Sequence, residues 1–249
     1  MMIVPFRSQR LTRDANNCNT WETVTEGREI VWKRSGLIIC DVWDRHWNAG
    51  AEKRLAPMLT QMDALARSLR KKGAVIVHAP SDCMDFYKDS VARTVMAGYA
   101  GHERPAYIEK PDQPSPLDAS DGGNDVDAPP ELVGKPVWTR QHPAIYIDDN
   151  IDSVSDDGDE IVSCFTKRGV ENVFIMGVHT NMCVLNRSFG IKNMVRWGFN
   201  TALLRDLTDP MYNPAMPPYV NNKEALALIV GYVEKFWCPS VDSRDLIGG

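Results

Sequence analysis

The sequence lacks a long apolar run and an excess of basic residues. None of its 249 residues fall in a stretch approaching the roughly 18 apolar residues of a membrane-spanning helix, so we expect no membrane partner. The N-terminal residues, MMIVPFRSQRLTRD, contain no apolar core of a secretory signal. Lys and Arg number 28 against 33 for Asp and Glu, giving a net charge of −5. This balance argues against binding to nucleic acid or an anionic membrane.

Closely spaced cysteines are also missing. The six cysteines are scattered, and no two lie at metal-binding or redox spacing. In a chain of this size, free thiols in a reducing compartment are the simplest interpretation, so we expect a cytoplasmic protein. Cys40 and Cys164 lie within apolar patterns and are expected to behave as small buried hydrophobic residues. We expect no bound cofactor.

Apolar runs that alternate with helical patterns are what the sequence does contain. Continuous apolar runs predict buried strands at 37–40, 74–77, 136–140, 173–176 and 201–204. Helical spacing predicts helices at about 52–72, up to Gly169, at about 181–197 and at about 222–236. This alternation predicts one α/β domain with three α/β/α layers and a mostly parallel central sheet.

Two segments fall outside this alternation. Residues 1–34 are polar with little periodicity, and we interpret them as an N-terminal arm with one short strand. Residues 99–134 contain six prolines and the run DASDGGNDVD, which predicts a long irregular insertion or lid.

Three residues of complementary chemistry are expected at one edge of the sheet. Ligands in such folds bind at the carboxyl ends of the strands. Asp41 follows the first strand, Arg140 ends the third, and Cys183 follows the fourth. A carboxylate can accept a thiol proton, a cation can hold the carboxylate or polarise a substrate, and a thiolate can attack. Each residue also has a structural interpretation: Asp41 as a turn cap, Arg140 as a surface ion-pair partner, and Cys183 as a buried helix residue.

Cys183 is expected in the first turn of a helix. The strand VFIM runs into GVHTNM, and the cysteine comes next. Backbone N–H groups and the helix dipole at such a position favour an anion, so we expect a lowered thiol pKa. The same N–H groups could hold an oxyanion.

The sequence resembles the isochorismatase-like cysteine hydrolases, which include nicotinamidases and N-carbamoylsarcosine amidase. The resemblance covers residues from about 36 to 236 and depends on LIICDVWD, VWTRQHPAIY and VFIMGVHTNMCV. It implies a parallel sheet between helix layers, hydrolysis of an amide-like small molecule, and a homo-oligomer of two or more copies.

The resemblance also implies roles for individual residues. Asp41 would be the general base and Cys183 the nucleophile. The Val178–His179 peptide bond would be cis, and the backbone N–H groups of His179 and Cys183 would form an oxyanion hole. The family's third catalytic residue is usually a lysine, whereas this motif position holds Arg140, which does not readily transfer a proton.

Other polar and aromatic residues are candidates for the pocket. Aromatic residues at a strand mouth are typical of a wall for a flat substrate, although Trp43 could equally be core. The candidates for substrate contact are Trp43, Trp47, His142, Tyr146 and His179.

Two weaker metal hypotheses come from acidic residues. His78, Asp82 and Asp85 lie near where nicotinamidases hold a metal, but their spacing does not reproduce the family motif, so we expect no metal there. Asp118, Asp121, Asn124 and Asp127 lack the spacing of a calcium loop and favour a solvated acidic loop.

The predicted function is cysteine-dependent hydrolysis of a C–N bond in an amide, carbamoyl or ureide-like small molecule, through a thioester. One alternative is an isochorismatase-type vinyl-ether hydrolase, although family members with that activity lack the nucleophilic cysteine. The other alternative is a non-catalytic binding protein on the same scaffold.

Overall fold

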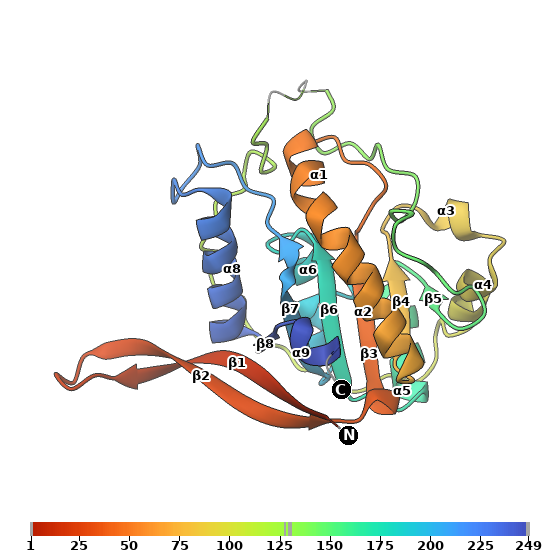
Figure 1. Ribbon diagram of the computed structural model, residues 1–249, viewed down its shortest axis with the longest axis horizontal. Coiled ribbons are helices and arrows are strands. Elements are labelled where there is room, and N and C mark those ends of the chain that lie inside the picture. Colours follow the sequence, from red (N-terminus) through yellow and green to blue (C-terminus); the bar gives the residue numbers. More distant parts are fainter. Residues whose placement is uncertain (1, 127, 129–130, 248–249) are drawn as a thin grey trace.

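An eight-stranded sheet forms the centre of the molecule (Figure 1). The computed structural model describes residues 2–126, 128 and 131–247. The strands lie in the order β2-β1-β8-β7-β6-β3-β4-β5, and all neighbours from β8 to β5 are parallel. The strands are β1 (Met2–Arg13), β2 (Asn19–Ile30), β3 (Ser35–Cys40), β4 (Val75–Ala79), β5 (Ser153–Val154), β6 (Asn172–Val178), β7 (Asn200–Asp209) and β8 (Ser240–Val241).

Helices cover both faces of this sheet. They are α1 (Ala49–Leu55), α2 (Leu59–Lys71), α3 (Met84–Tyr87), α4 (Val91–Ala97), α5 (Gly158–Lys167), α6 (Cys183–Asn186), α7 (Ile191–Arg196), α8 (Asn222–Phe236) and α9 (Arg244–Ile247), with short 3-10 turns η1 (Trp32–Arg34) and η2 (Ala56–Met58). Alternate residues of β3 face opposite layers. Ile38 belongs to the apolar cluster with α5, α7 and α8, whereas Leu37 and Ile39 belong to the cluster with α2 and α9. This confirms the predicted three-layer α/β/α architecture with a mostly parallel sheet.

The predicted strand at 136–140 is wrong. The described structure contains no strand there; instead, the backbone N–H groups of Thr139 and Arg140 donate to the side chain of Asp44. Gln141 makes only an isolated bridge to Trp43. The edge position beside β4 is filled by β5. This short apolar segment lies between Pro136 and Pro143, and it forms a loop whose backbone is held by the Asp44 carboxylate.

The predicted helix at about 181–197 is interrupted. Helix α6 ends at Asn186, and α7 begins only at Ile191. Arg187 leaves the helical conformation with ψ of 156°. The interruption places Arg187 where its side chain can reach the end of β3, as described below.

The N-terminal arm is a long hairpin rather than a segment with one short strand. β1 and β2 pair without a break from Met2 opposite Ile30 to Arg13 opposite Asn19. The turn is held by the Asp14 carboxylate, which accepts from two backbone N–H groups. The arm has little apolar periodicity because most of β2 is exposed on both faces.

The described residues of the insertion at 99–134 contain no helix or strand, as the sequence predicts. Its first half is tied to α7, since Ile108 donates to the Arg196 carbonyl and Asp112 pairs with Lys192 and Arg196. Its second half reaches the carboxyl end of the sheet, where Asp125 pairs with Arg54.

Candidate active site

Asp41 lies at the carboxyl end of β3 and is completely buried. Its backbone has a positive φ of 51°. One carboxylate oxygen accepts from the backbone N–H of Ser81 at 2.8 Å, and the other accepts from Nε of Arg187 at 3.0 Å. Burial raises the pKa of Asp41, while Arg187 and a hydrogen bond from Cys183 oppose that rise.

Cys183 is the first residue of α6, directly after the turn that follows β6. Its thiol lies beside the Asp41 carboxylate and the backbone N–H of His179, and both groups affect its pKa. Gly177 permits the approach of β6 to β3, because a Cβ there would lie 1.9 Å from the Cys40 carbonyl oxygen. The turn thus brings the thiol against the buried carboxylate.

The expected lowering of the Cys183 pKa is not what the structure shows. Burial and the negative charge of Asp41 raise the pKa of the thiol, and Arg187 and the His179 N–H only partly oppose this. Helix α6 has just four residues, so its dipole contributes little. Burial thus favours a proton on the sulfur, and Arg187 is the neighbouring cation that favours the charged form of Asp41.

Arg187 is the residue that sequence reasoning missed. Its guanidinium contacts Asp41 and lies 3.7 Å from Asp82, and these carboxylates raise its pKa. The available signal was its spacing: residues four apart lie on one face of a helix, and Arg187 comes four after Cys183.

Arg140 is not brought to this site. It is exposed, and its guanidinium lies 5.4 Å from the centre of the Phe86 ring. Its backbone carbonyl accepts from Asp44. The strand that was expected to aim Arg140 at the sheet edge does not form, so the positive charge beside Asp41 comes from Arg187 instead.

The turn between β6 and α6 presents two backbone N–H groups near the sulfur. The Val178–His179 peptide bond is cis. Among the hydrogen bonds between described residues, neither His179 nor Cys183 donates its backbone N–H to an oxygen. In the described structure neither of these two N–H groups therefore has an oxygen acceptor.

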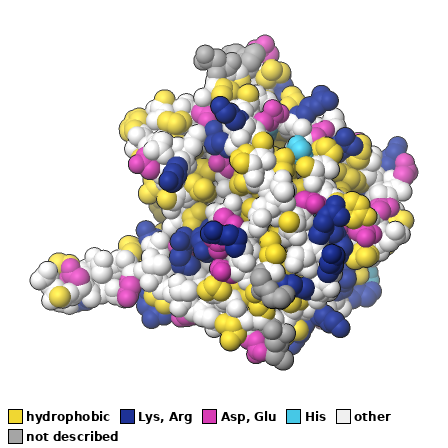
Figure 2. Space-filling view, in the orientation of Figure 1, with side chains coloured by type: hydrophobic (Ala, Val, Ile, Leu, Met, Phe, Trp, Pro, Cys, Tyr) yellow, Lys and Arg dark blue, Asp and Glu magenta, His cyan; other side chains and the backbone are white. Residues whose placement is uncertain are grey.

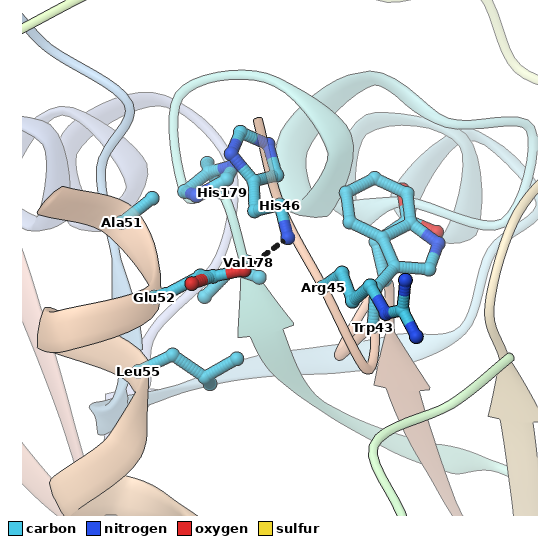
Figure 3. A pocket seen from close by; sticks show the side chains of 9 residues that line it. Trp43, Arg45, His46, Ala51, Glu52, Leu55, Val178 and His179 are labelled. Atoms are coloured by element: carbon cyan, nitrogen blue, oxygen red, sulfur yellow. Dashed lines mark hydrogen bonds between the residues drawn. The ribbon is translucent and has the colours of Figure 1, made fainter. Parts of the chain in front are cut away.

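A small cavity adjoins Asp41 (Figure 3). Its volume is about 10 Å³, which is close to that of a single water site. Its polar and aromatic lining comprises Asp41, Trp43, Arg45, His46, Glu52 and His179. His46 and His179 meet edge to face at 5.0 Å, and burial lowers the pKa of both, that of His46 to about 4. Both rings are thus neutral near pH 7.

The aromatic candidates differ in where they lie. Trp43 is buried, stacks on Trp138 at 3.9 Å and lines the small cavity, so it is both core and wall. Trp47 is half-buried and contacts His46 at 5.1 Å. His142 lines an adjoining hollow of about 230 Å³ with Trp43. Tyr146 is exposed under the guanidinium groups of Arg67 and Arg70 on α2, away from this lining.

The metal candidates do not assemble. His78 is buried between Gln141 and Asp152, at 2.9 and 3.0 Å. Asp82 and Asp85 are exposed. Across the described ranges, no three His, Cys, Asp or Glu side chains gather as a metal site.

The acidic residues of the insertion make local contacts. Asp118 and Asn124 each accept from the backbone two residues ahead, and Asp121 accepts from Gly123 and Asn213. Asp127 lies outside the described residues. Also within the described part of the chain, no helix has the length and apolarity to cross a membrane.

Comparisons with known proteins identify the fold. No family model and no curated protein matches the sequence. A cysteine hydrolase from Pseudomonas syringae pv. phaseolicola 1448A has a similar structure, with a TM-score of 0.51 at 14% identity over 88% of this chain and 92% of that one. A putative isochorismatase from Burkholderia xenovorans LB400 has a TM-score of 0.50 at 14% identity, covering 86% of each chain. The chain thus has the isochorismatase-like fold.

Proposed function

We propose that this protein is a cysteine-dependent hydrolase that cleaves a C–N bond in an amide, carbamoyl or ureide-like small molecule. The observation that carries the proposal is the position of the Cys183 thiol beside the buried Asp41 carboxylate, whose Oδ2 accepts from Arg187. A buried carboxylate is costly unless it is paired. Its pairing to a thiol at the carboxyl edge of the sheet is typical of a nucleophile and its base.

The first half of the reaction forms a thioester. Asp41 takes the proton of Cys183 as the sulfur attacks the carbonyl carbon, and the carbonyl oxygen gains the negative charge. The N–H groups of His179 and Cys183 would stabilise this oxyanion. Protonated Asp41 then gives its proton to the nitrogen, the C–N bond breaks and the amine leaves.

The second half regenerates the enzyme. Asp41 takes a proton from water as the water oxygen attacks the thioester carbon. The C–S bond breaks, the acid is released, and the sulfur takes the proton from Asp41. A proton thus moves between Asp41 and the sulfur twice, which suits a thiol whose pKa is raised, because a thiolate is needed only at the moment of attack.

Arg187 takes the electrostatic role in this proposal. It opposes the burial that raises the pKa of Asp41, and so it favours the ionised carboxylate that can accept a proton. A guanidinium does not readily transfer protons, so Asp41 alone carries the acid and base steps.

The substrate is proposed to enter beside Trp43 and His142. The hollow of about 230 Å³ that they line shares Trp43, Glu52 and Leu55 with the small cavity at Asp41. In this proposal the substrate passes from the hollow through the small cavity toward the carboxylate and His179. Another hollow, of about 310 Å³, is lined by Cys183, Asn186 and Arg187 and is the alternative route.

An ammonia-release screen tests the function. Nicotinamide, carbamoyl amines, ureides and small primary amides would be offered to the parent protein and to Cys183→Ala. We expect release by the parent with at least one compound and none above background by the variant. Release by Cys183→Ala at the parental rate would refute the nucleophile, and ligand binding without turnover by the parent would support the binding-protein alternative.

A pair of bulky substitutions tests the route. His142→Trp should raise KM several-fold, whereas Asn186→Trp, at the other hollow, should not. The opposite pattern would assign the substrate to the hollow beside Arg187.

A further inference from the structure

The outer strand of the hairpin arm has an unpaired edge. β2 is the last strand of the sheet order, and its only strand partner among the described residues is β1. In Figure 1 the arm projects from the body beneath α8, with no other element beyond β2. The inner side of the arm contacts the body through Arg7, which pairs with Glu234 of α8, and Trp21, which meets Phe236.

Most features that protect an edge strand are missing from β2. It contains no proline, and its register with β1 has no bulge along twelve residue pairs. Such an edge presents a row of free backbone donors and acceptors. A projecting two-stranded hairpin is also only marginally stable in water, and a third strand would stabilise it. The remaining protection is charge, from three glutamates and Arg28.

We propose that β2 pairs antiparallel with β2 of a second copy of this chain, about a two-fold axis at Thr25. The two sheets then join edge to edge into one continuous sheet. This surface is separate from the candidate active site, and the proposal does not depend on the proposed hydrolysis.

The charges of β2 and the number of residues that pair together select this register. A two-fold axis perpendicular to the sheet must pass through a residue, since facing residues share a face of the sheet. With the axis at Thr25, Glu22 of each copy faces Arg28 of the other, giving two opposite-charge pairs. An axis at Val24 would set Glu22 against Glu26 twice, and an axis at Glu26 would set that residue against itself. Like charges directly opposite one another destabilise a strand pair.

The remaining pairs of this register are compatible. Thr23 faces Gly27, Val24 faces Glu26 and Thr20 faces Ile30, so no like charges meet. An axis at Thr23 would avoid repulsion too, but it would pair fewer residues and no opposite charges. An axis at Gly27 would set Glu26 against Arg28 twice, but it would pair only seven residues of each β2 strand, whereas the axis at Thr25 pairs eleven. In Figure 2 the arm stands clear of the body with acidic and uncharged side chains on its visible surface, leaving room for a second strand.

Exchanging the charges of Glu22 and Arg28 tests the pairing of β2 between two copies. Analytical ultracentrifugation of the full chain at micromolar concentration should show a dimer. Glu22→Lys and Arg28→Glu should each weaken the dimer by about tenfold, because two attractive pairs become repulsive. The double variant should recover most of the parental affinity. The substitutions also remove contacts within one chain, namely Glu22 opposite Arg10, Arg28 over Phe6 and the ion pair of Arg28 with Glu26. These losses persist in the double variant, so a recovery of affinity reports contact between copies.

A cysteine pair tests the axis. In a Cys18→Ser background, which removes the exposed thiol of the arm, Thr25→Cys should form a disulfide-linked dimer on mild oxidation. Facing residues have Cβ atoms about 4.5–5.5 Å apart. Thr23→Cys is the matched control on the same face, and its two copies would be more than about 13 Å apart. A monomer in sedimentation, an unrescued double variant, or equal cross-linking of both cysteines would overturn the proposal.

Discussion

Nε of Arg187 donates to Oδ2 of Asp41 at 3.0 Å, from a position four residues after Cys183. The arginine, rather than any residue of the 136–140 segment, supplies the positive charge at the buried carboxylate. The contact forms because α6 ends one residue before Arg187, whose backbone then turns out of the helix. A charge on the same turn as the nucleophile thus holds one oxygen of the base, while the backbone N–H of Ser81 holds the other.

Removal of Arg187 should move the acid limb of the pH–rate profile. Arg187 lowers the pKa of Asp41, so Arg187→Gln should raise that pKa further and leave the base protonated at a higher pH. In kcat/KM measurements on a substrate from the screen, the acid limb should shift to higher pH. Arg140→Gln is the matched control and should leave the limb in place. A shift in Arg140→Gln and none in Arg187→Gln would assign the role to Arg140.

Asp41→Asn should abolish the proton transfer while keeping the shape of the side chain. The amide cannot accept the thiol proton, so kcat should fall by about 10²–10⁴-fold. Circular dichroism and substrate binding by the variant serve as controls for folding. Unchanged kcat in a folded variant would remove Asp41 from the mechanism.

Cys183 should react with iodoacetamide as a thiol of high pKa. The thiolate is the reacting form, and burial with Asp41 raises the pKa of Cys183. Its alkylation rate, followed by peptide mass spectrometry, should keep rising with pH beyond pH 9. Asp41→Asn removes the negative charge and should increase the rate at pH 8. A plateau near neutral pH in the parent would mean a pre-formed thiolate.

Gly177 should tolerate no side chain. It has φ of 126°, and a Cβ would lie 1.9 Å from the Cys40 carbonyl oxygen. Gly177→Ala should lower the free energy of unfolding by more than about 3 kcal/mol, because backbone must move. Gly169→Ala is the control, with positive φ but nothing within 4 Å, and should cost about 1–2 kcal/mol. Equal losses in urea denaturation would contradict the close approach of β6 and β3.

The lowered pKa of His46 should make the free energy of unfolding decrease as the pH falls. Its folded pKa of about 4 lies below the ordinary value of 6.5, so the unfolded state binds its proton first. The free energy of unfolding that the neutral His46 contributes is complete above about pH 6.5 and is lost as the pH falls through 4. His46→Gln should therefore flatten the pH dependence of the free energy of unfolding between those values. A parallel curve for the variant would mean that His46 titrates normally.

Local patterns determined most of the layered body. The apolar runs at 37–40 and 173–176 became β3 and β6, and the periodic segment at 222–236 became α8 with the predicted bounds. These predictions succeeded because a strand buried on both faces and a helix buried on one leave periodic apolar residues in the sequence. The turn after β6 and the position of Asp41 follow from the same order of elements.

Tertiary contacts decided the rest. The segment 136–140 is apolar enough for a strand, but β5 occupies the edge beside β4, and Asp44 holds the segment as a loop. The hairpin arm has no apolar period, because its pairing is through backbone groups that every residue carries. Arg187 supplies the positive charge beside Asp41 because α6 ends one residue before it. The sequence by itself determined the layers and the edge where Asp41 and Cys183 lie; only the tertiary structure decided that Arg187 completes their contact, since a long side chain's partner is set by the path of the backbone across space.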